Sequence, residues 1–443
     1  MSHGFPPLLF RFPEGAATPM NKSSKNPDTF PRLLTGVLMC LGIFLIPAFF
    51  AVPDTAKNLA AAEAPPESQK IEKTVPETDT PPPEPPNYKK AMKKIQELEE
   101  NPGTGEGLAV ARGLLWLARH QHSDGGWSFA HTRAPGCKAK CENPGMMPKA
   151  RNAATALALL PMLGVRITHK EGIYKENVRA GLSFLCDRIK LEPGKDGSFQ
   201  EDGGTMVSHG LTTLCLTEAY GRSKDKNLRI YAQLAVNHIV TMQDPESGGW
   251  RYLPTRKCDT SVTGLQMLAL KSGYAAYLSY PAETAKNTMT FLDAVQTHDG
   301  AFYGFDRPGE DATGTAVGLL CRMYYGWRSD RPALEEGVEW LSRCGPAEDD
   351  VHHNYYATQV MRHYGGPHWE KLYPAMRDRL VAAQVTDAAG HEYGIWYHPS
   401  EKPGYEQGGR HYVTAMSLLT LNPYHLWEPR MYINPGIRID MKE

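Results

Sequence analysis

The sequence lacks an excess of charge of either sign. It carries 48 lysines and arginines against 49 aspartates and glutamates, which leaves a formal net charge of −1. Proteins that bind the phosphate backbone of nucleic acids need a broad positive surface. The balance therefore argues against nucleic acid as a partner, and it indicates no particular protein partner.

Closely paired cysteines are also scarce. The eight cysteines are scattered, without the paired short spacings that are typical of structural zinc sites. Only Cys137 and Cys141 lie near each other, in a stretch that contains proline and glycine. In an extracytoplasmic domain such a pair forms a local disulfide or stays as two free thiols, and the spacing leaves both open.

One long apolar run occurs near the N-terminus, at residues 33–52. It carries no charge and is long enough, as a helix, to cross the hydrocarbon core of a membrane. Lys22, Lys25 and Arg32 precede it and Asp54 follows it, so the positive-inside bias leaves the N-terminus in the cytoplasm. A cleaved signal peptide is the alternative, although its apolar part is usually shorter. We expect a membrane anchor and an extracytoplasmic C-terminal domain.

Composition divides the chain into six segments. Nine prolines between residues 53 and 86 disfavour both helix and strand and indicate an extended spacer. In order, the segments are a cytoplasmic tail at 1–32, the anchor at 33–52, the proline-rich linker at 53–87, a short charged helix at 88–106, a globular domain at 107–425 and a C-terminal tail at 426–443.

A turn string recurs through the globular domain, with a glutamine followed by Asp-Gly or Gly-Gly and an aromatic residue. It reads QHSDGGW at 121–127, QDPESGGW at 243–250 and QTHDGAF at 296–302, and partial versions occur at 196–199 and 384–396. The expected hairpin whose turn falls near residue 345 has no such string. Five of six expected hairpins therefore carry the same kind of turn.

A helix rich in small apolar residues is expected after each turn. These segments are 152–164, 207–220, 260–273, 312–325, 354–364 and 412–421. They recur at the spacing of two helices and a loop, and six such hairpins can close into an inner and an outer ring that leave no apolar face uncovered. The sequence predicts an all-α fold, an (α/α)6 toroid of six helical hairpins.

The turn strings resemble the QW motifs of squalene and oxidosqualene cyclases. The hairpin series as a whole is similar to the repeats that these cyclases share with the beta subunits of protein prenyltransferases, over about residues 107–425. The resemblance implies that Gln and Asp of the string cap helix ends while the aromatic ring packs between hairpins. It also implies a central cavity for an isoprenoid or another hydrophobic ligand, surrounded by the first turns of the inner helices.

The residues at these first turns predict a polar rim. The candidate rim residues are Arg151, His209, Cys258, Asp259, Asp311, His353 and His411. Asp259 and Asp311 are the candidate catalytic residues among them. Several tyrosines on the same helices could contact a cation or stack on a sugar ring.

The acid expected from the cyclase resemblance is incomplete. The resemblance implies a DxDDT sequence whose middle aspartate donates a proton, whereas residues 256–260 read RKCDT. Cys258 takes the place of the acid, and a thiol cannot protonate an alkene. Arg256 and Lys257 are expected to favour the ionised form of Asp259. Cyclisation started by protonation is therefore not expected.

The zinc set implied by the prenyltransferase resemblance is incomplete too. His411 falls where the zinc-binding histidine would lie, but Lys257 and Asp259 occupy the positions of the other ligands. Asp259 and His411 are the remaining zinc candidates, although helix capping is the commoner role of such residues. No cofactor is expected.

Three functions stay open on this evidence. The first is action on, or binding of, an isoprenoid or other hydrophobic ligand. The second is a non-catalytic toroid that binds a ligand or a protein. The third is a glycan-cleaving enzyme that uses Asp259 and Asp311 as paired carboxylates.

Overall fold

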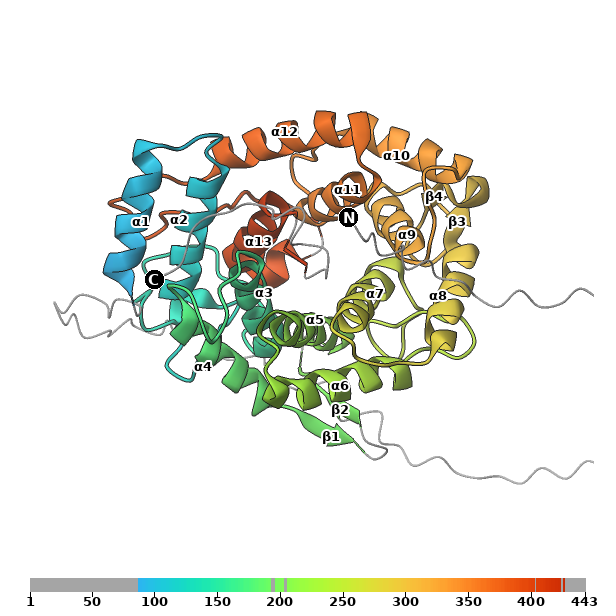
Figure 1. Ribbon diagram of the computed structural model, residues 1–443, viewed down its shortest axis with the longest axis horizontal. Helices are drawn as coiled ribbons and strands as arrows, with labels where there is room; N and C mark the ends of the chain where they lie inside the picture. Colours follow the sequence, from blue (N-terminus) through green and yellow to red (C-terminus); the bar gives the residue numbers. More distant parts are fainter. Residues whose placement is uncertain (1–86, 193–195, 203–204, 403, 424, 427–443) are drawn as a thin grey trace, which may run out of the picture. The chain divides into compact units, whose positions relative to one another are not determined.

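A computed structural model describes residues 87–426, apart from 193–195, 203–204, 403 and 424. Thirteen α-helices, two short 3-10 helices and four short strands occur in this part of the chain. Twelve of the helices form two concentric rings (Figure 1).

The inner ring is a closed circle of six helices. They are α3 (Arg151–Gly164), α5 (Thr205–Ser223), α7 (Thr260–Ala275), α9 (Ala312–Tyr324), α11 (Val351–Tyr364) and α13 (Tyr405–Leu421). Each contacts the next one in this order, and α13 contacts α3, which closes the circle. The expected (α/α)6 toroid is confirmed as the arrangement of the helices.

The outer ring consists of the first helix of each hairpin. These helices are α2 (Glu106–Arg119), α4 (Lys175–Cys186), α6 (Lys226–Thr241), α8 (Ala282–Val295), α10 (Pro332–Cys344) and α12 (Gly366–Ala383). The last of them, α12, contacts α2 of the first hairpin as well as its own partner α13. Helix α1 (Tyr88–Glu100) packs on the outside of α2 through the buried Ala91 and Ile95.

Short strands and 3-10 turns occur only in the loops that join outer to inner helices, within the described residues. Strand β1 (Lys190–Glu192) pairs antiparallel with β2 (Asp196–Ser198), and β3 (Gln296–Thr297) pairs antiparallel with β4 (Phe302–Tyr303). The 3-10 helices are η1 (His131–Arg133) and η2 (His298–Gly300). The fifth hairpin, which lacks the turn string, joins α10 to α11 through the short segment 345–350.

Small residues allow the inner helices to approach closely. A Cβ atom added to Gly264 of α7 would lie 2.1 Å from the Cγ1 atom of Val317 on α9. Real side chains cannot come so near, so the contact between α7 and α9 requires glycine at this position. This explains the small-residue composition of the second helix in each hairpin.

The glutamine of the turn string joins neighbouring hairpins. Gln121 donates through Nε2 to its own turn, at the carbonyl of Gly125, and to the carbonyl of Asn177 on α4. Gln243 makes the corresponding pair of bonds to Gly248 and to Thr284 on α8. The glutamine thus satisfies its own turn and also connects it to the next outer helix.

Gln384 repeats this pattern at the point where the ring closes. Its Nε2 donates to the carbonyl of Gly394, 3.0 Å away, and to the carbonyl of Ala109 on α2, 2.8 Å away. Around the ring, the outer helix that follows the last hairpin is α2, which is the first outer helix along the chain. The same local chemistry that joins consecutive hairpins therefore joins the two ends of the domain.

The aromatic residue of the string is fixed by two hydrogen bonds. The indole N–H of Trp127 donates to the carbonyl of Leu117 at the end of α2, and its backbone N–H donates to Oγ1 of Thr155 on α3. Trp250 makes the equivalent bonds to Ile239 and Thr263. Each tryptophan is fully buried. The aromatic residue therefore links the end of an outer helix to the inner helix that follows it.

Polar contacts near the C-terminal end of α5 join α5 and α11 to residues that follow α13. Glu218 and Arg222 of α5 form a buried ion pair at 3.2 Å, and Arg222 also donates to the carbonyl of His425. The ring of His425 lies 3.1 Å from the hydroxyl of Tyr355 on α11. Gln359 donates to the carbonyl of Pro423. These contacts seat the residues around His425 against this end of the inner ring.

No candidate for a bilayer-spanning helix occurs among the described residues. The expected N-terminal tail at 1–32 and anchor at 33–52 lie outside them, as do the expected linker at 53–87 except residue 87 and the expected C-terminal tail at 426–443 except residue 426.

Candidate functional site

Three consecutive inner helices begin with an aspartate that caps its own helix. Asp259 accepts a hydrogen bond from the backbone N–H of Val262, and Asp311 accepts one from Gly314. Asp350, before α11, accepts one from His353. A carboxylate at this position satisfies an otherwise unpaired N–H and interacts favourably with the helix dipole. Both candidate catalytic residues thus have a structural partner at the rim.

The pKa of Asp259 is shifted in the direction opposite to the sequence-based expectation. Burial raises the pKa of the Asp259 carboxyl above its usual value, and the nearby Asp306 adds to the increase, against the lowering effect of the hydrogen bonds from Val262 and Ser261. Arg256 and Lys257 were expected to favour the ionised form, but both side chains are exposed to solvent. Desolvation therefore outweighs the two cations, and that expectation is wrong.

Cys258 and Arg151 are held by contacts within their own hairpins. The thiol of Cys258 is buried and lies 3.1 Å from the hydroxyl of Ser247. Arg151 forms two hydrogen bonds to the carboxylate of Asp124, in the first turn string, and one to the carbonyl of Trp127. Both residues lie at the rim, where they tie the turn strings to the starts of the inner helices.

His209 takes the place of a threonine in the second repeat. Its Nδ1 accepts a hydrogen bond from the backbone N–H of Phe199, as Oγ1 of Thr155 and of Thr263 does for a tryptophan in other repeats. Its Nε2 lies 3.0 Å from the carbonyl of Ala235.

His353 and His411 are buried as well. Nε2 of His411 lies 2.8 Å from the carbonyl of Ala154 on α3, and burial lowers the pKa of His411 to about 4. Burial also lowers the pKa of His353, whose Nδ1 has no hydrogen-bond partner. Both rings are neutral near pH 7 and contribute packing between inner helices.

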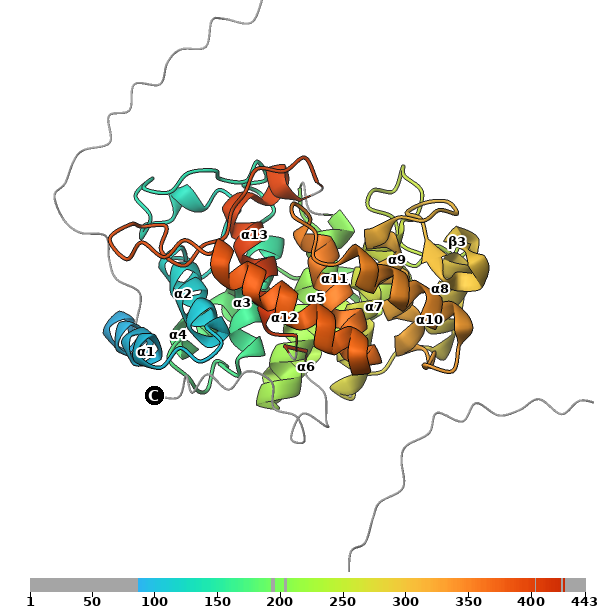
Figure 2. The same ribbon diagram turned by 90° about the horizontal axis from the view of Figure 1, so that it is seen from above.

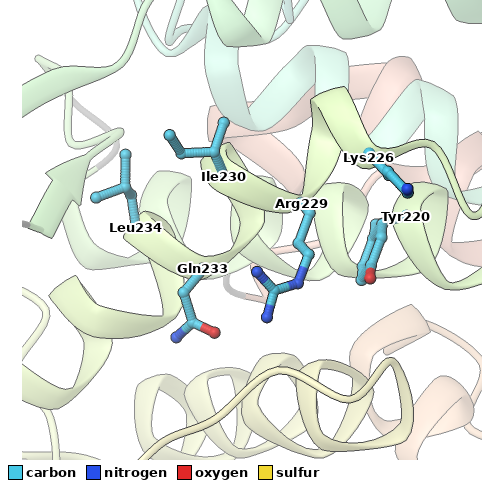
Figure 3. A pocket seen from close by; sticks show the side chains of 6 residues that line it. All are labelled: Tyr220, Lys226, Arg229, Ile230, Gln233 and Leu234. Carbon is cyan, nitrogen blue, oxygen red and sulfur yellow. The ribbon is translucent and has the colours of Figure 1, made fainter.

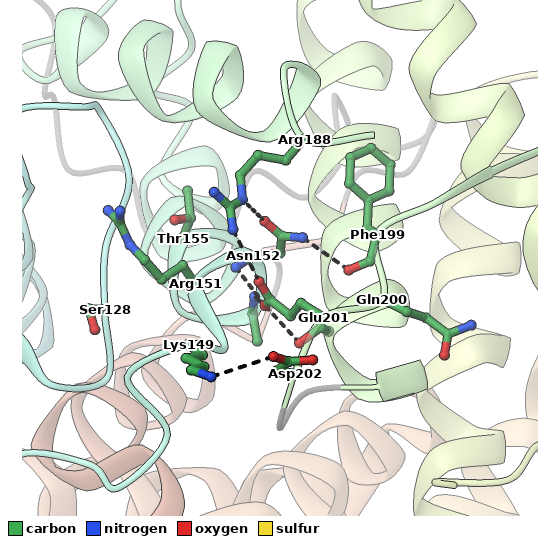
Figure 4. Close-up of polar contacts among 12 residues, drawn as sticks. Ser128, Lys149, Arg151, Asn152, Thr155, Arg188, Phe199, Gln200, Glu201 and Asp202 are labelled. Carbon is green, nitrogen blue, oxygen red and sulfur yellow. Dashed lines mark hydrogen bonds and ion pairs between the residues drawn. The ribbon is translucent and has the colours of Figure 1, made fainter. Parts of the chain in front are cut away.

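A carboxylate that the sequence did not point to caps α3 from the neighbouring hairpin. Glu201 accepts hydrogen bonds from the backbone N–H groups of Asn152, at 2.7 Å, and Ala153, at 3.1 Å, and from the hydroxyl of Ser208 (Figure 4). Burial raises the pKa of Glu201. Glu201 lies in a loop without a regular pattern, so only the ring geometry brings it to this helix.

The rim does not gather the expected zinc candidates. Among the described residues, neither Asp259 nor His411 belongs to a group of three or more side chains that could hold one metal ion. One such group does occur elsewhere in the described part of the ring and consists of His120, Cys137, Cys141 and His391. Sequence reasoning missed it because His391 is far from the other three residues along the chain.

Two pockets lie beside the outer helix α6. The larger, of about 660 Å³, is lined by Tyr220 at the end of α5 and by side chains along α6, which include Lys226, Arg229 and Ile230 (Figure 3). The smaller, of about 350 Å³, lies between α4 and α6. Neither contains a residue of the predicted rim.

Comparisons with known proteins add limited information. No protein-family model and no curated protein matches the chain. Solved structures that are similar include a type II terpene cyclase from Scytonema, with 15% identity, a TM-score of 0.48 and coverage of 74% of this chain and 97% of the cyclase. An α-1,6-mannanase from Salegentibacter sp. HEL1_6 has 9% identity and a TM-score of 0.49, with coverage of 71% and 99%.

An α-amylase from Clostridium perfringens is similar at 12% identity and a TM-score of 0.47, with coverage of 73% of this chain and 98% of the amylase. These likenesses are too distant to assign an activity. The fold assignment accordingly rests on the helix contacts of the two rings.

Proposed function

We propose that the ring binds an apolar ligand of the isoprenoid or lipid class at its rim end and does not transform it. The observation that carries the proposal is a set of partly exposed apolar side chains on inner helices. Val207 and Leu211 of α5 and Leu265 of α7 are all only partly buried. An inner helix is covered by its two inner neighbours and by its outer partner. Side chains that remain partly exposed along its first turns therefore face the axis of the ring.

Aromatic rings lie near the same end, on α11 and α13. The ring centroids of His352 and Tyr356 are 4.9 Å apart, and those of Tyr405 and Tyr412 are 6.2 Å apart. Apolar and aromatic side chains with a few polar groups are typical of sites for small apolar ligands. Because His425 and Pro423 bond to α5 and α11 away from the rim, we expect the ligand to enter between the loops of the rim.

We do not propose catalysis, because the rim carboxylates have other roles. Glycan cleavage needs two carboxylates that are available to the sugar, whereas Asp259 and Asp311 each accept a hydrogen bond from their own helix. Cyclisation needs a strong acid at the position that Cys258 occupies. Catalytic roles for Asp259 and Asp311 stay predictions for the experiment below.

The experiment measures binding of squalene and of a polyprenyl alcohol to the purified full chain, with product analysis in parallel. Leu211→Trp fills the space near the axis and is expected to weaken binding by about tenfold or more. Ile230→Trp is the matched control, because Ile230 lies on α6 at 60% exposure and should leave affinity unchanged.

Two outcomes would contradict the proposal. If the folded full chain binds neither squalene nor the polyprenyl alcohol, the proposed ligand class is wrong. Formation of a product that is lost in Asp259→Asn would show catalysis in place of simple binding.

We also propose that residues 33–52 hold the ring at a membrane, on the side away from the cytoplasm. This rests on the length of the apolar run and on the positive charges before it. A membrane location would supply an apolar ligand at high local concentration.

A further inference from the structure

Two histidines and two cysteines from opposite ends of the domain converge on one point. The residues are His120, Cys137, Cys141 and His391. Each offers one ligand atom, a ring nitrogen from each histidine and Sγ from each cysteine, and these four atoms all lie within 4.8 Å of one another. His120, Cys137 and Cys141 are buried, at 0%, 0% and 5% exposure. His391 is partly buried, and two thiols with two imidazoles are a set of side chains that zinc prefers.

His120 is oriented to present one particular nitrogen to this point. Its Nδ1 lies 2.7 Å from the backbone carbonyl of Trp116, one turn earlier in α2. A carbonyl can only accept, so Nδ1 carries the hydrogen and Nε2 keeps its lone pair. Nε2 lies 3.4 Å from Sγ of Cys141. A histidine whose distal nitrogen is held by a carbonyl is the usual arrangement of a metal ligand.

His391 lies beside His120 and Cys137 in this group. Its Nε2 is buried and has no hydrogen bond, and its ring lies 5.2 Å from that of His120. An unpaired buried nitrogen costs free energy unless something else satisfies it. A cation bound between the two rings would do so.

The two cysteines come from a tight turn after α2. Lys138 and Ala139, between them, have positive φ angles of 47° and 55°. Ala139 donates its N–H to the carbonyl of Thr132, which holds the turn against the loop of η1. Both cysteines are free thiols in the structure. Of the two alternatives that the sequence left open, the structure has the two free thiols.

We propose that His120, Cys137, Cys141 and His391 bind one structural Zn²⁺ ion that fastens the last hairpin to the first. Two thiolates and two imidazoles are a preferred tetrahedral set for zinc, and four protein ligands leave no position for a substrate. Zn–S bonds of about 2.3 Å and Zn–N bonds of about 2.0 Å give ligand separations of about 3.3 to 3.8 Å. Because the ligand atoms lie within 4.8 Å of one another, each pair approaches by at most about 1.5 Å when the ion binds.

The placement of the ligands gives the ion its role. His120, Cys137 and Cys141 belong to the loop between α2 and α3, whereas His391 lies between α12 and α13. Figure 2 shows the first of these loops above the ring beside the start of α13, where Pro144 and Gly409 form a bridge. Glu392 reinforces the contact, since it accepts from the backbone N–H of Glu142 and pairs with Arg410.

The inference is independent of the proposed function, because it concerns ring closure and not the rim. Closing a ring made from distant parts of a chain costs entropy that local contacts do not recover. A metal ion bound only by the folded state stabilises that state by mass action.

The test begins with the metal content of the purified full chain, measured by elemental analysis. We expect about one zinc per chain in the parent and less than about a tenth in Cys137→Ser and in His391→Asn. Cys215→Ser is the matched control, because Cys215 is a buried free thiol of α5 outside the group and its loss should leave the zinc in place. Replacement by Co²⁺ should produce the visible and thiolate charge-transfer bands of a tetrahedral site in the parent and in Cys215→Ser, but not in Cys137→Ser or His391→Asn.

The second measurement concerns ring closure. Removal of zinc by a chelator should lower the Tm of the parent by about 5 °C or more and speed hydrogen exchange in α2 and in the loop before α13, with recovery when zinc is added back. A zinc-free parent, or a Cys137–Cys141 disulfide found by mass spectrometry in the native chain, would overturn the proposal. Zinc removal without any change in Tm or exchange would overturn the closing role.

Discussion

Asp259 is at once a helix cap and a buried carboxyl, and the two roles affect stability differently. Because folding raises the pKa of Asp259, its favourable contribution is complete below the pKa of the unfolded chain, about 3.9, and is lost as pH rises through the folded pKa. Asparagine has no such titration and caps a helix about as well.

We therefore expect the stability of Asp259→Asn, relative to the parent, to increase as pH rises through this interval and to level off above it. The measurement is the free energy of unfolding by urea at a series of pH values. If the free energy of unfolding of Asp259→Asn relative to the parent stays constant or decreases as pH rises, burial does not raise the pKa of Asp259.

At the scale of single elements, a threonine on four of the inner helices accepts a hydrogen bond from the backbone N–H of an aromatic residue in or next to the turn string. Thr263→Val removes the acceptor of the backbone N–H of Trp250 while it preserves shape, and leaves a buried donor unpaired. We expect a loss of about 1–3 kcal/mol in the free energy of unfolding.

Thr358→Val on α11 is the matched control for this change. Thr358 is fully buried and its hydroxyl has no hydrogen-bond partner, so the same substitution should be neutral or stabilising. Denaturant unfolding of the two variants checks the pair, and equal effects would mean that the threonines act only through packing.

At the scale of the whole molecule, contacts between distant residues hold the two ends of the ring together. Gln384 bonds to Ala109, α12 contacts α2, and the group around His391 joins the last loop to the first. The first and last hairpins thus depend on each other. We expect them to lose structure together when the proposed metal is removed.

The location of the whole chain can be tested with one cysteine. Cys344 is the exposed cysteine among the described residues, so a membrane-impermeant maleimide should label it in intact cells if the ring lies outside the cytoplasm. Cys344→Ser should abolish the labelling. A chain without residues 33–52 should leave the membrane fraction. Labelling only after lysis would place the ring in the cytoplasm.

The sequence by itself determined the repeat and hence the ring. Each turn string requires an outer helix before it and an inner helix after it, and its glutamine and tryptophan bond mostly within one hairpin or to the next. Such information is local and periodic, so it can be recognised along the chain. The composition of the second helices was equally informative, because close packing at Gly264 requires a residue without a side chain.

Only the tertiary structure decided the chemistry of the site. The raised pKa of Asp259 depends on burial by other segments, and Glu201 reaches the start of α3 only because two hairpins are neighbours. The cysteines looked like an isolated pair, since His391 comes beside them through closure of the ring. The set of side chains around a metal and the burial of a carboxyl both depend on distances in space. Closure of the ring brings together residues that are far apart along the chain, so the sequence alone does not show that they are neighbours.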